Sequence, residues 1–266
     1  MFQMKLKNNA FNTPFETLTL QYGTPKYNSI DPTPYFSLSQ VLFFGLMSAD
    51  VGYGLLLFIA TFVPIMFFEL SPGMRKTLKS FNYMSVGTIL VGLFFGSFFG
   101  FSLPFGVMDL SAQVIEVMIF SVALGLVHLL VAYSLKFYLT MREKDYGSSY
   151  LDALQQIMML IGGGLMAINL VLEIPILNTI GLVLLLGNVI GMFVVNMIVA
   201  KNPLIGFGQG AFGLIDLAGM IGDIVSYTRL TALAVAGANI GMAFNLIVGL
   251  LPPFVRFTVG ILLFLA

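Results

Sequence analysis

The sequence predicts an all-α polytopic membrane protein with about seven complete transmembrane helices and a truncated eighth. Of its 266 residues, 58% are hydrophobic and only 9% are charged, and the mean hydropathy is +0.98. Soluble domains carry about 25% charged residues, so lipid is the expected main environment. Five apolar stretches reach the ~20 residues that a spanning helix needs, and they lie at about 83–103, 112–139, 152–171, 176–200 and 212–249.

The apolar block at 36–68 is too long for one ordinary span. Asp50, Gly52 and Gly54 interrupt it, and residues of these types favour a turn or a helix break. We therefore expect two short helices with Asp50 as a cap at the break. Near the other end, residues 254–266 form a helix of only about 20 Å against a ~30 Å hydrocarbon core, so the eighth helix is expected to be truncated.

The stretch at 212–249 predicts an unusually long helix. At 1.5 Å per residue its length is about 57 Å, which exceeds the ~30 Å hydrocarbon core. Tilting is one way in which a membrane helix accommodates such an excess. We therefore expect a long, strongly tilted helix here.

The distribution of basic residues predicts the orientation. Lys and Arg concentrate in short cytoplasmic loops, whereas the connections at about 104–111, 173–175 and 251–253 contain neither. Inside and outside loops alternate without conflict if the N-terminus is cytoplasmic. The basic residues expected on the cytoplasmic side are Lys5, Lys7, Lys26, Arg75, Lys76, Lys79, Lys136, Arg142, Lys144 and Lys201.

Composition also excludes several classes of function. Twelve Lys and Arg balance twelve Asp and Glu, so there is no net positive charge for a nucleic acid partner. The chain has no Cys and one His, which argues against thiolate and histidine metal sites. No Gly-rich phosphate loop of the Walker type occurs. We expect no catalytic residue, metal or cofactor in this chain.

Arg229 is the main candidate for function. It lies near the middle of the 212–249 stretch, where an Arg costs at least about 2.5–3.5 kcal/mol, and an ionisable residue at such a position is functional by default. The alternative is a structural Arg paired with a carboxylate on a neighbouring helix.

Small residues surround this arginine. They permit tight packing between helices, and they also permit a smooth face against a moving partner. The sequence leaves both interpretations open. These residues are Gly222, Ser226, Ala232, Ala234, Ala236, Gly237, Ala238 and Gly241.

Two carboxylates precede the arginine on the same helix. Asp216 and Asp223 are seven residues apart and share nearly one face, whereas Arg229 lies roughly 120° round from Asp223. The orientation above puts both carboxylates between Arg229 and the cytoplasm, where they are candidates for a hydrated cation entry path. The alternative is a pair of interfacial carboxylates that bond adjacent helices.

The stretch at 112–139 carries Glu116 and His128, which are not on one face. Each is a candidate for a proton relay or for a buried structural hydrogen-bonding group.

Two sequence motifs resemble those of a known protein family. The chain is similar to the a subunit of vacuolar ATPases and to subunit I of bacterial and archaeal V/A-type ATPases. One motif resembles the start of that family's membrane domain, and the other resembles its essential-arginine motif, SYLRLxALxLA. In this chain the segments are Tyr22-Gly23-Thr24-Pro25, Ile30-Asp31-Pro32-Thr33-Pro34, Phe43 to Gly54 (FFGLMSADVGYG) and Ser226-Tyr227-Thr228-Arg229-Leu230-Thr231-Ala232-Leu233-Ala234.

The resemblance implies a stator membrane subunit of a rotary ATPase that forms H⁺ or Na⁺ half-channels against a rotating proteolipid ring. Arg229, with Asp216 and Asp223, is then the ion-translocation site, and Gly222, Ser226, Ala236 and Gly237 face the ring. Implied partners are the proteolipid ring, other membrane-sector and stalk subunits, and lipid.

The resemblance also implies a division of the chain and a location. Residues 1–34 correspond to the end of a cytoplasmic domain and 35–266 to the ion-translocating domain, in the cell membrane of a bacterium or archaeon. The large cytoplasmic domain and the end of the last helix are not in this sequence, so a fragment is expected.

Two other functions remain open from the sequence. One is a secondary transporter or channel subunit that uses Arg229 to bind an anionic substrate. The other is a structural assembly subunit, in which Arg229 tolerates Ala.

Overall fold

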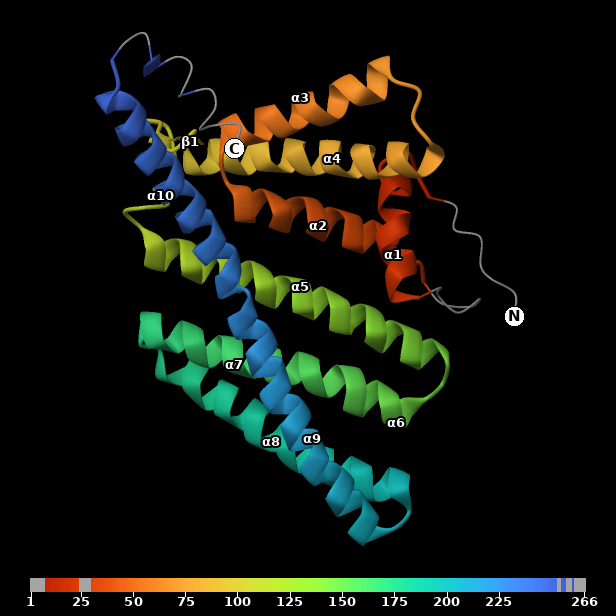
Figure 1. Ribbon diagram of the computed structural model, residues 1–266. Helices are drawn as coiled ribbons and strands as arrows, with labels where there is room; N and C mark the ends of the chain where they lie inside the picture. Colours follow the sequence, from red (N-terminus) through yellow and green to blue (C-terminus); the bar gives the residue numbers. More distant parts are fainter. Residues whose placement is uncertain (1–7, 24–29, 253–254, 257–259, 261–266) are drawn as a thin grey trace. The chain divides into compact units, whose positions relative to one another are not determined.

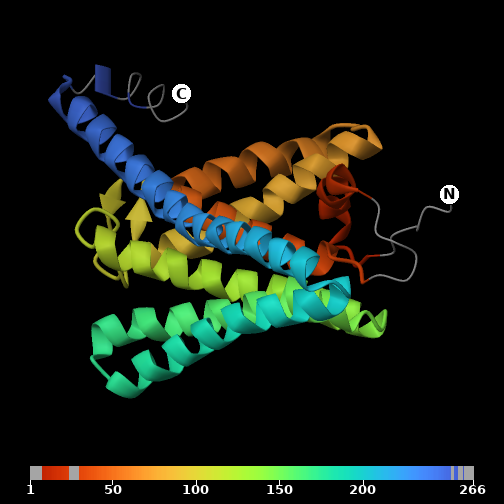
Figure 2. The ribbon, with the colours of Figure 1, turned by 90° about the horizontal axis from the view of Figure 1, so that it is seen from below.

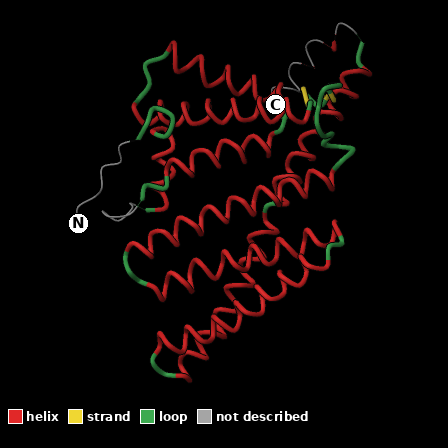
Figure 3. The backbone as a smooth tube through the Cα atoms, turned by 180° about the vertical axis from the view of Figure 1, so that it is seen from behind, coloured by secondary structure: helices red, strands yellow, loops and turns green. Residues whose placement is uncertain are grey.

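The computed structural model describes residues 8–23, 30–252, 255–256 and 260. Figure 1 shows the helices in chain order, and Figure 3 separates helix, strand and loop. The chain divides into two compact units, one made of Met1–Ser121 and Thr228–Ala266 and the other of Val122–Tyr227. Both units are built almost entirely from helices.

The described part of the first unit runs from a 3-10 turn to a long helix. Its sheet, the one among the described residues, is a two-stranded antiparallel hairpin. The elements are the turn Thr13–Phe15, α1 (Glu16–Tyr22), α2 (Thr33–Ser48), α3 (Val51–Phe67), α4 (Pro72–Phe95), β1 (Ser97–Phe98), β2 (Phe101–Ser102), the first part of α5 (Val114–Arg142), and α10 (Thr228–Leu250).

The second unit contains the remaining part of α5 and four further helices. α8 packs against both α7 and α9, and Figure 2 shows α7 and α8 running side by side. The elements after α5 are α6 (Tyr146–Ser149), a π-helical turn (Tyr150–Leu154), α7 (Gln155–Leu172), α8 (Pro175–Ala200) and α9 (Pro203–Ser226).

Five helical segments in the described part of the chain are long and apolar enough to cross a membrane. They are Pro72–Phe95, Val114–Arg142, Tyr146–Asn169, Pro175–Ala200 and Pro203–Leu250. Each corresponds to one of the five expected stretches, and the fold agrees with an all-α membrane protein. With 16 and 17 residues, α2 and α3 are shorter than an ordinary span, so the number of crossings stays a prediction. The expected eighth helix at 254–266 falls largely outside the described residues.

Two boundaries were wrong. The helix expected at 83–103 is α4, which begins at Pro72 after the Ser71 cap and ends before Gly96, whose φ of 66° is left-handed. The polar first turns of α4 hid its start, and the apolar sequence of the following hairpin read as helix. The helix expected at 212–249 begins at Pro203 instead, where α9 starts. α9 ends at Ser226, and Tyr227 alone separates it from α10. Its tilt in a membrane stays a prediction.

The break between α2 and α3 is confirmed. Ala49 is left-handed, with a φ of 37°, and Asp50 is extended, with a φ of −142°. The Asp50 carboxylate accepts hydrogen bonds from the N–H groups of Gly52 at 2.8 Å and Tyr53 at 3.1 Å. These N–H groups have no intrahelical acceptor in the first turn of a helix. Asp50 is therefore the N-cap of α3, as the sequence predicted.

The segment before α2 packs on the beginning of α4. Phe15 is fully buried, and the ring of Phe11 lies 5.0 Å from the ring of Tyr83, centroid to centroid. Lys76 forms an ion pair with Glu16 at 3.1 Å. Whether residues 1–34 continue a cytoplasmic domain stays a prediction.

Glycines allow α4 to approach both of its neighbours closely. A Cβ atom at Gly87 would lie 2.6 Å from the Val41 carbonyl oxygen on α2, and one at Gly92 would lie 2.5 Å from the Val51 nitrogen at the start of α3. Close backbone approach at small residues is a general source of stability between membrane helices.

We expect Gly92→Ala to lower the free energy of unfolding by about 1–3 kcal/mol, because the added methyl group meets backbone atoms that cannot move aside. Gly73→Ala on the same helix is the control, since no described atom lies within 4 Å of its added Cβ and Ala favours helix over Gly. Denaturation in detergent micelles, followed by circular dichroism, measures both. Equal stability of the two variants would contradict the packing argument.

Candidate functional site

The helix that carries Arg229 has one buried and one exposed face. Thr231, Ala234 and Gly241 are buried, and their spacings of three and seven residues put them on one side of a helix. Arg229 lies on the opposite side and is exposed. The other exposed residues of that side include Ala232, Leu233, Ala236, Ile240, Ala243 and Ile247.

Polar contacts fix the buried face of α10 at two places. Near its start, the Thr231 hydroxyl donates to the Ser121 hydroxyl at 2.8 Å and lies 3.3 Å from the Val117 carbonyl oxygen. Near its end, the Asn245 amide donates to the Phe99 carbonyl oxygen at 2.7 Å. These contacts set the rotation of α10 about its axis, and thereby the direction in which Arg229 points.

The small residues now separate into two groups. Ala234 is 2% exposed, and a Cβ at Gly241 would lie 3.0 Å from Gly100, so these two serve packing. A Cβ at Gly222 or Gly237 would meet no described atom within 4 Å. The packing interpretation therefore holds for the first group, while the second group is open toward the surroundings of the chain.

Two further residues, Ala236 and Ser226, were also predicted to face the ring. Ala236 is exposed. Ser226 is partly exposed, and its hydroxyl donates to the Asp223 carbonyl oxygen at 2.7 Å.

The junction that precedes Arg229 is anchored within the second unit. The Tyr227 hydroxyl lies 2.8 Å from Nδ1 of His128, and the Tyr227 ring lies directly over Gly125, where any Cβ would collide with it. The Tyr227 backbone stays right-handed, with φ −68° and ψ −18°. His128 is thus a hydrogen-bonding partner of the junction, a geometry that suits either of the roles predicted for it.

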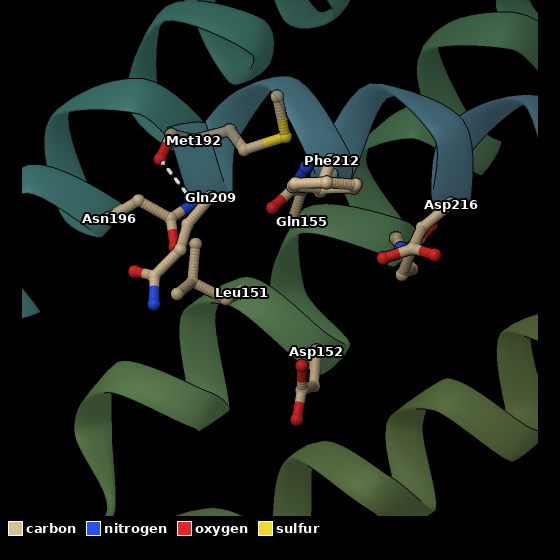
Figure 4. A pocket seen from close by; sticks show the side chains of 10 residues that line it. Leu151, Asp152, Gln155, Met192, Asn196, Gln209, Phe212 and Asp216 are labelled. Carbon is tan, nitrogen blue, oxygen red and sulfur yellow. Dashed lines mark hydrogen bonds between the residues drawn. The ribbon is translucent and has the colours of Figure 1, made fainter. Parts of the chain in front are cut away.

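A polar cavity of about 210 Å³ lies between α7, α8 and α9, and it includes Asp216 (Figure 4). Its lining residues are Leu151, Asp152, Gln155, Gln156, Met192, Asn196, Gln209, Phe212, Gly213 and Asp216.

Hydrogen bonds hold part of this lining in place. The Asn196 amide donates to the Met192 carbonyl oxygen at 2.9 Å, as Figure 4 shows, and the buried Asn188 amide donates to the Gln155 carbonyl oxygen at 2.8 Å. The Oε1 atom of Gln156 is buried and has no hydrogen-bond partner among the described residues. A water molecule in the cavity would satisfy such an atom.

The π-helical turn Tyr150–Leu154 forms one edge of the cavity. Turns of this type are frequent at functional sites. Asp152, within the turn, lies 3.8 Å from the ammonium group of Lys136 on α5. The turn therefore brings a second carboxylate to the cavity that contains Asp216.

The other predicted residues lie elsewhere. Asp223 is exposed on α9 and does not line the cavity with Asp216. Glu116 is exposed in the first turn of α5, where the helix dipole favours a carboxylate. Asp50 is 4% exposed at its cap. Among the described residues, no three His, Cys, Asp or Glu side chains gather in a metal-binding group.

The amide side chains of the cavity were not predicted, because only ionisable residues were candidates. A polar residue within an apolar helix also indicates a functional or polar site, and four such residues are Gln155, Gln156, Asn196 and Gln209. Their distance along the chain hides that they meet Asp216 in one cavity.

We expect Asp216→Cys to react with a water-soluble maleimide and the neighbouring Ile215→Cys to stay unlabelled. A thiol reacts as the thiolate, which needs water, and Asp216 lines the polar cavity, whereas Ile215 is 65% exposed on an apolar surface. The chain contains no Cys, so labelling followed by mass spectrometry reports one site at a time. Equal labelling at both positions would mean that the cavity is no wetter than the lipid-facing surface.

Comparison with known proteins gives relatives but no matching family model. The A-type ATP synthase subunit I of Pyrococcus horikoshii is 33% identical over 253 residues, which cover 92% of this chain and 37% of that protein. The subunit I of Pyrococcus abyssi is 34% identical over 251 residues, with the same shares. The subunit I of Methanocaldococcus jannaschii is 28% identical over 305 residues, 98% of this chain and 42% of that protein.

The chain thus spans about two fifths of the length of these curated relatives. The resemblance that the two motifs predicted is confirmed. This chain is a homologue, over nearly its whole length, of part of subunit I of the A-type ATP synthases.

Proposed function

We propose that this chain is a stator membrane subunit of a rotary V/A-type ATPase and that α10 presents Arg229 to a rotating ring of ion-binding proteolipid subunits. The observation that carries the proposal is the position of Arg229 on the exposed face of α10, opposite the face that Thr231 and Gly241 bury. The names of the relatives support a rotary ATPase.

The chemistry of arginine fits this task. A guanidinium stays protonated in proteins, whereas an ammonium loses its charge more readily on desolvation. A positive charge close to a carboxylate favours the ionised carboxylate. When a ring carboxylate reaches Arg229, its bound H⁺ or Na⁺ is released, and the fixed charge prevents cations from passing straight through.

The open small residues fit a moving partner. Ala232, Ala236 and Gly237 lie on or beside the face of α10 that carries Arg229, and Gly222 on α9 is open as well. No long side chain projects at these four positions, so a neighbouring helix can pass them at short range.

The polar cavity fits the cytoplasmic access path for the ion. It lies along the middle of α9 and the last half of α8, and the connection between these two helices contains Lys201. The distribution of basic residues puts this connection and the N-terminus in the cytoplasm. Carboxylate and amide groups of Asp216, Asp152 and Gln209 would hold water and attract cations along the path.

The assembly follows from the same proposal. Other membrane-sector and stalk subunits and lipid are partners, and the nucleotide chemistry belongs to other subunits. The curated relatives named above are archaeal proteins, which supports a cell-membrane location in an archaeon or bacterium. Residues 35–266 then form the ion-translocating domain, and 1–34 lead into it from the cytoplasm.

We expect Arg229→Lys to lose most ATP-driven ion pumping, because a desolvated ammonium releases its proton more readily than a guanidinium. The measurement uses vesicles that contain the complete complex assembled with this subunit. Arg75→Lys, in the polar first turn of α4, is the control and should pump normally. Near-normal pumping by Arg229→Lys would contradict the proposal, and tolerance of Ala at this position would favour an assembly subunit.

We also expect Asp216→Asn to slow pumping several-fold without uncoupling it from ATP hydrolysis. The substitution removes a negative charge from the cavity but leaves Arg229 in place. Raising the concentration of the transported cation on the cytoplasmic side should recover part of the rate. The substitution impairs the supply of the cation to the ring and not its release at Arg229. Asp223→Asn, outside the cavity, is the matched control, and equal defects in both variants would contradict a specific role of the cavity.

A further inference from the structure

Asp50 makes more hydrogen bonds than a helix cap needs. Besides Gly52 and Tyr53, its carboxylate accepts from three groups of the β1–β2 hairpin. These are the Phe99 N–H at 2.9 Å to Oδ1, and the Ser97 hydroxyl at 2.7 Å and the Gly100 N–H at 3.0 Å, both to Oδ2. A single carboxylate, 4% exposed, thus joins the α2–α3 break to the hairpin.

The hairpin turn depends on this carboxylate. Phe99 and Gly100 are both left-handed, with φ values of 49° and 75°, and this conformation is unfavourable for a bulky residue such as Phe. Their N–H groups both point at Asp50. The Phe99 ring also lies against Gly52 and 5.3 Å from the ring of Tyr53, centroid to centroid. Asp50 and the start of α3 therefore hold the turn in a conformation that its sequence alone disfavours.

The same turn contacts the end of α10. The Phe99 carbonyl oxygen accepts from the Asn245 amide at 2.7 Å. Gly100 meets Gly241 backbone to backbone, and a Cβ at Gly100 would lie 2.5 Å from the Met242 nitrogen. Phe99 and Gly100, which both donate to Asp50, are thus also the hairpin residues that contact α10.

We propose that Asp50 is a positioning residue for Arg229, acting through the hairpin turn to fix the rotation of α10. This inference rests on the proposed function. The contacts at Thr231 and at Gly241 are about 15 Å apart along the helix. With the contact at Gly241 lost, α10 keeps its contact at Thr231 and its packing on α2 but loses the restraint that the hairpin turn provides. It is then able to turn or tilt, and Arg229 no longer meets the ring at a fixed place.

Asp50→Asn tests this directly. An amide has one acceptor oxygen and one donor nitrogen, so it cannot serve the Ser97 hydroxyl and the Gly100 N–H as a carboxylate oxygen does. Asn245→Leu breaks the second link, between the turn and α10, and leaves Asp50 intact. Asp145→Asn is the control. Its carboxylate lies in the second unit and caps α6 by accepting from the Ser148 N–H at 3.1 Å, and this hydrogen bond holds the pKa of Asp145 below its ordinary value.

Hydrogen–deuterium exchange of the complete complex in detergent reports on the links themselves. We expect faster exchange at 97–102 and at 241–248 in Asp50→Asn, and at 241–248 in Asn245→Leu. Asp145→Asn should leave 241–248 unchanged. Wild-type exchange at 241–248 in Asp50→Asn would overturn the inference.

The number of ions moved per ATP hydrolysed reports on the position of Arg229. A merely structural role of Asp50 would reduce the amount of assembled complex and leave this ratio unchanged. We expect a lower ratio in Asp50→Asn and in Asn245→Leu, and a double variant no worse than the more impaired single one, because both act through one chain of contacts.

A normal ratio in Asp50→Asn together with an impaired Arg229→Lys would overturn this inference and leave the proposed function standing. A normal ratio in Arg229→Lys would instead contradict the proposed function itself.

Discussion

Burying one face of α10 while leaving Arg229 on the other is the constraint on which the arrangement depends. An arginine in the middle of an apolar helix costs at least about 2.5–3.5 kcal/mol. The helix must therefore be held in one rotation so that the arginine points toward its partner. Thr231, Gly241 and Asn245 supply the contacts that fix it. None of these three residues bears a charge. They orient the positive charge of Arg229, which lies on the opposite face of α10.

The sequence predicted those features that depend on local chemistry. Asp50 stood out as a cap because it interrupts an apolar block, and Arg229 because an ionisable residue in such a block is costly. The hairpin at 97–102 was missed because its phenylalanines read as a continued helix, and Gly96 was not recognised as a stop. The polar cavity was missed for a different reason. Gln155, Asn196 and Gln209 come together only through the packing of three helices, which no local pattern encodes.

Two carboxylates that looked alike in the sequence have different surroundings in the structure. Asp216 lines a polar cavity with several amide groups, whereas Asp223, two helical turns later, does not. Helical periodicity placed both on nearly one face. What separates them is the neighbouring structure: α8, the start of α7 and the π-helical turn provide polar groups beside Asp216 but not beside Asp223.

The open glycines have a mechanical consequence. Each bulky side chain on a stationary surface adds a barrier that a passing rotor must climb once per step, and the sum of such barriers acts as friction. At Gly222 and Gly237 nothing projects beyond the backbone, so these two positions would add little to such friction. Under the proposed function, a substitution such as Gly222→Leu would leave the ion stoichiometry intact and waste part of each step as heat.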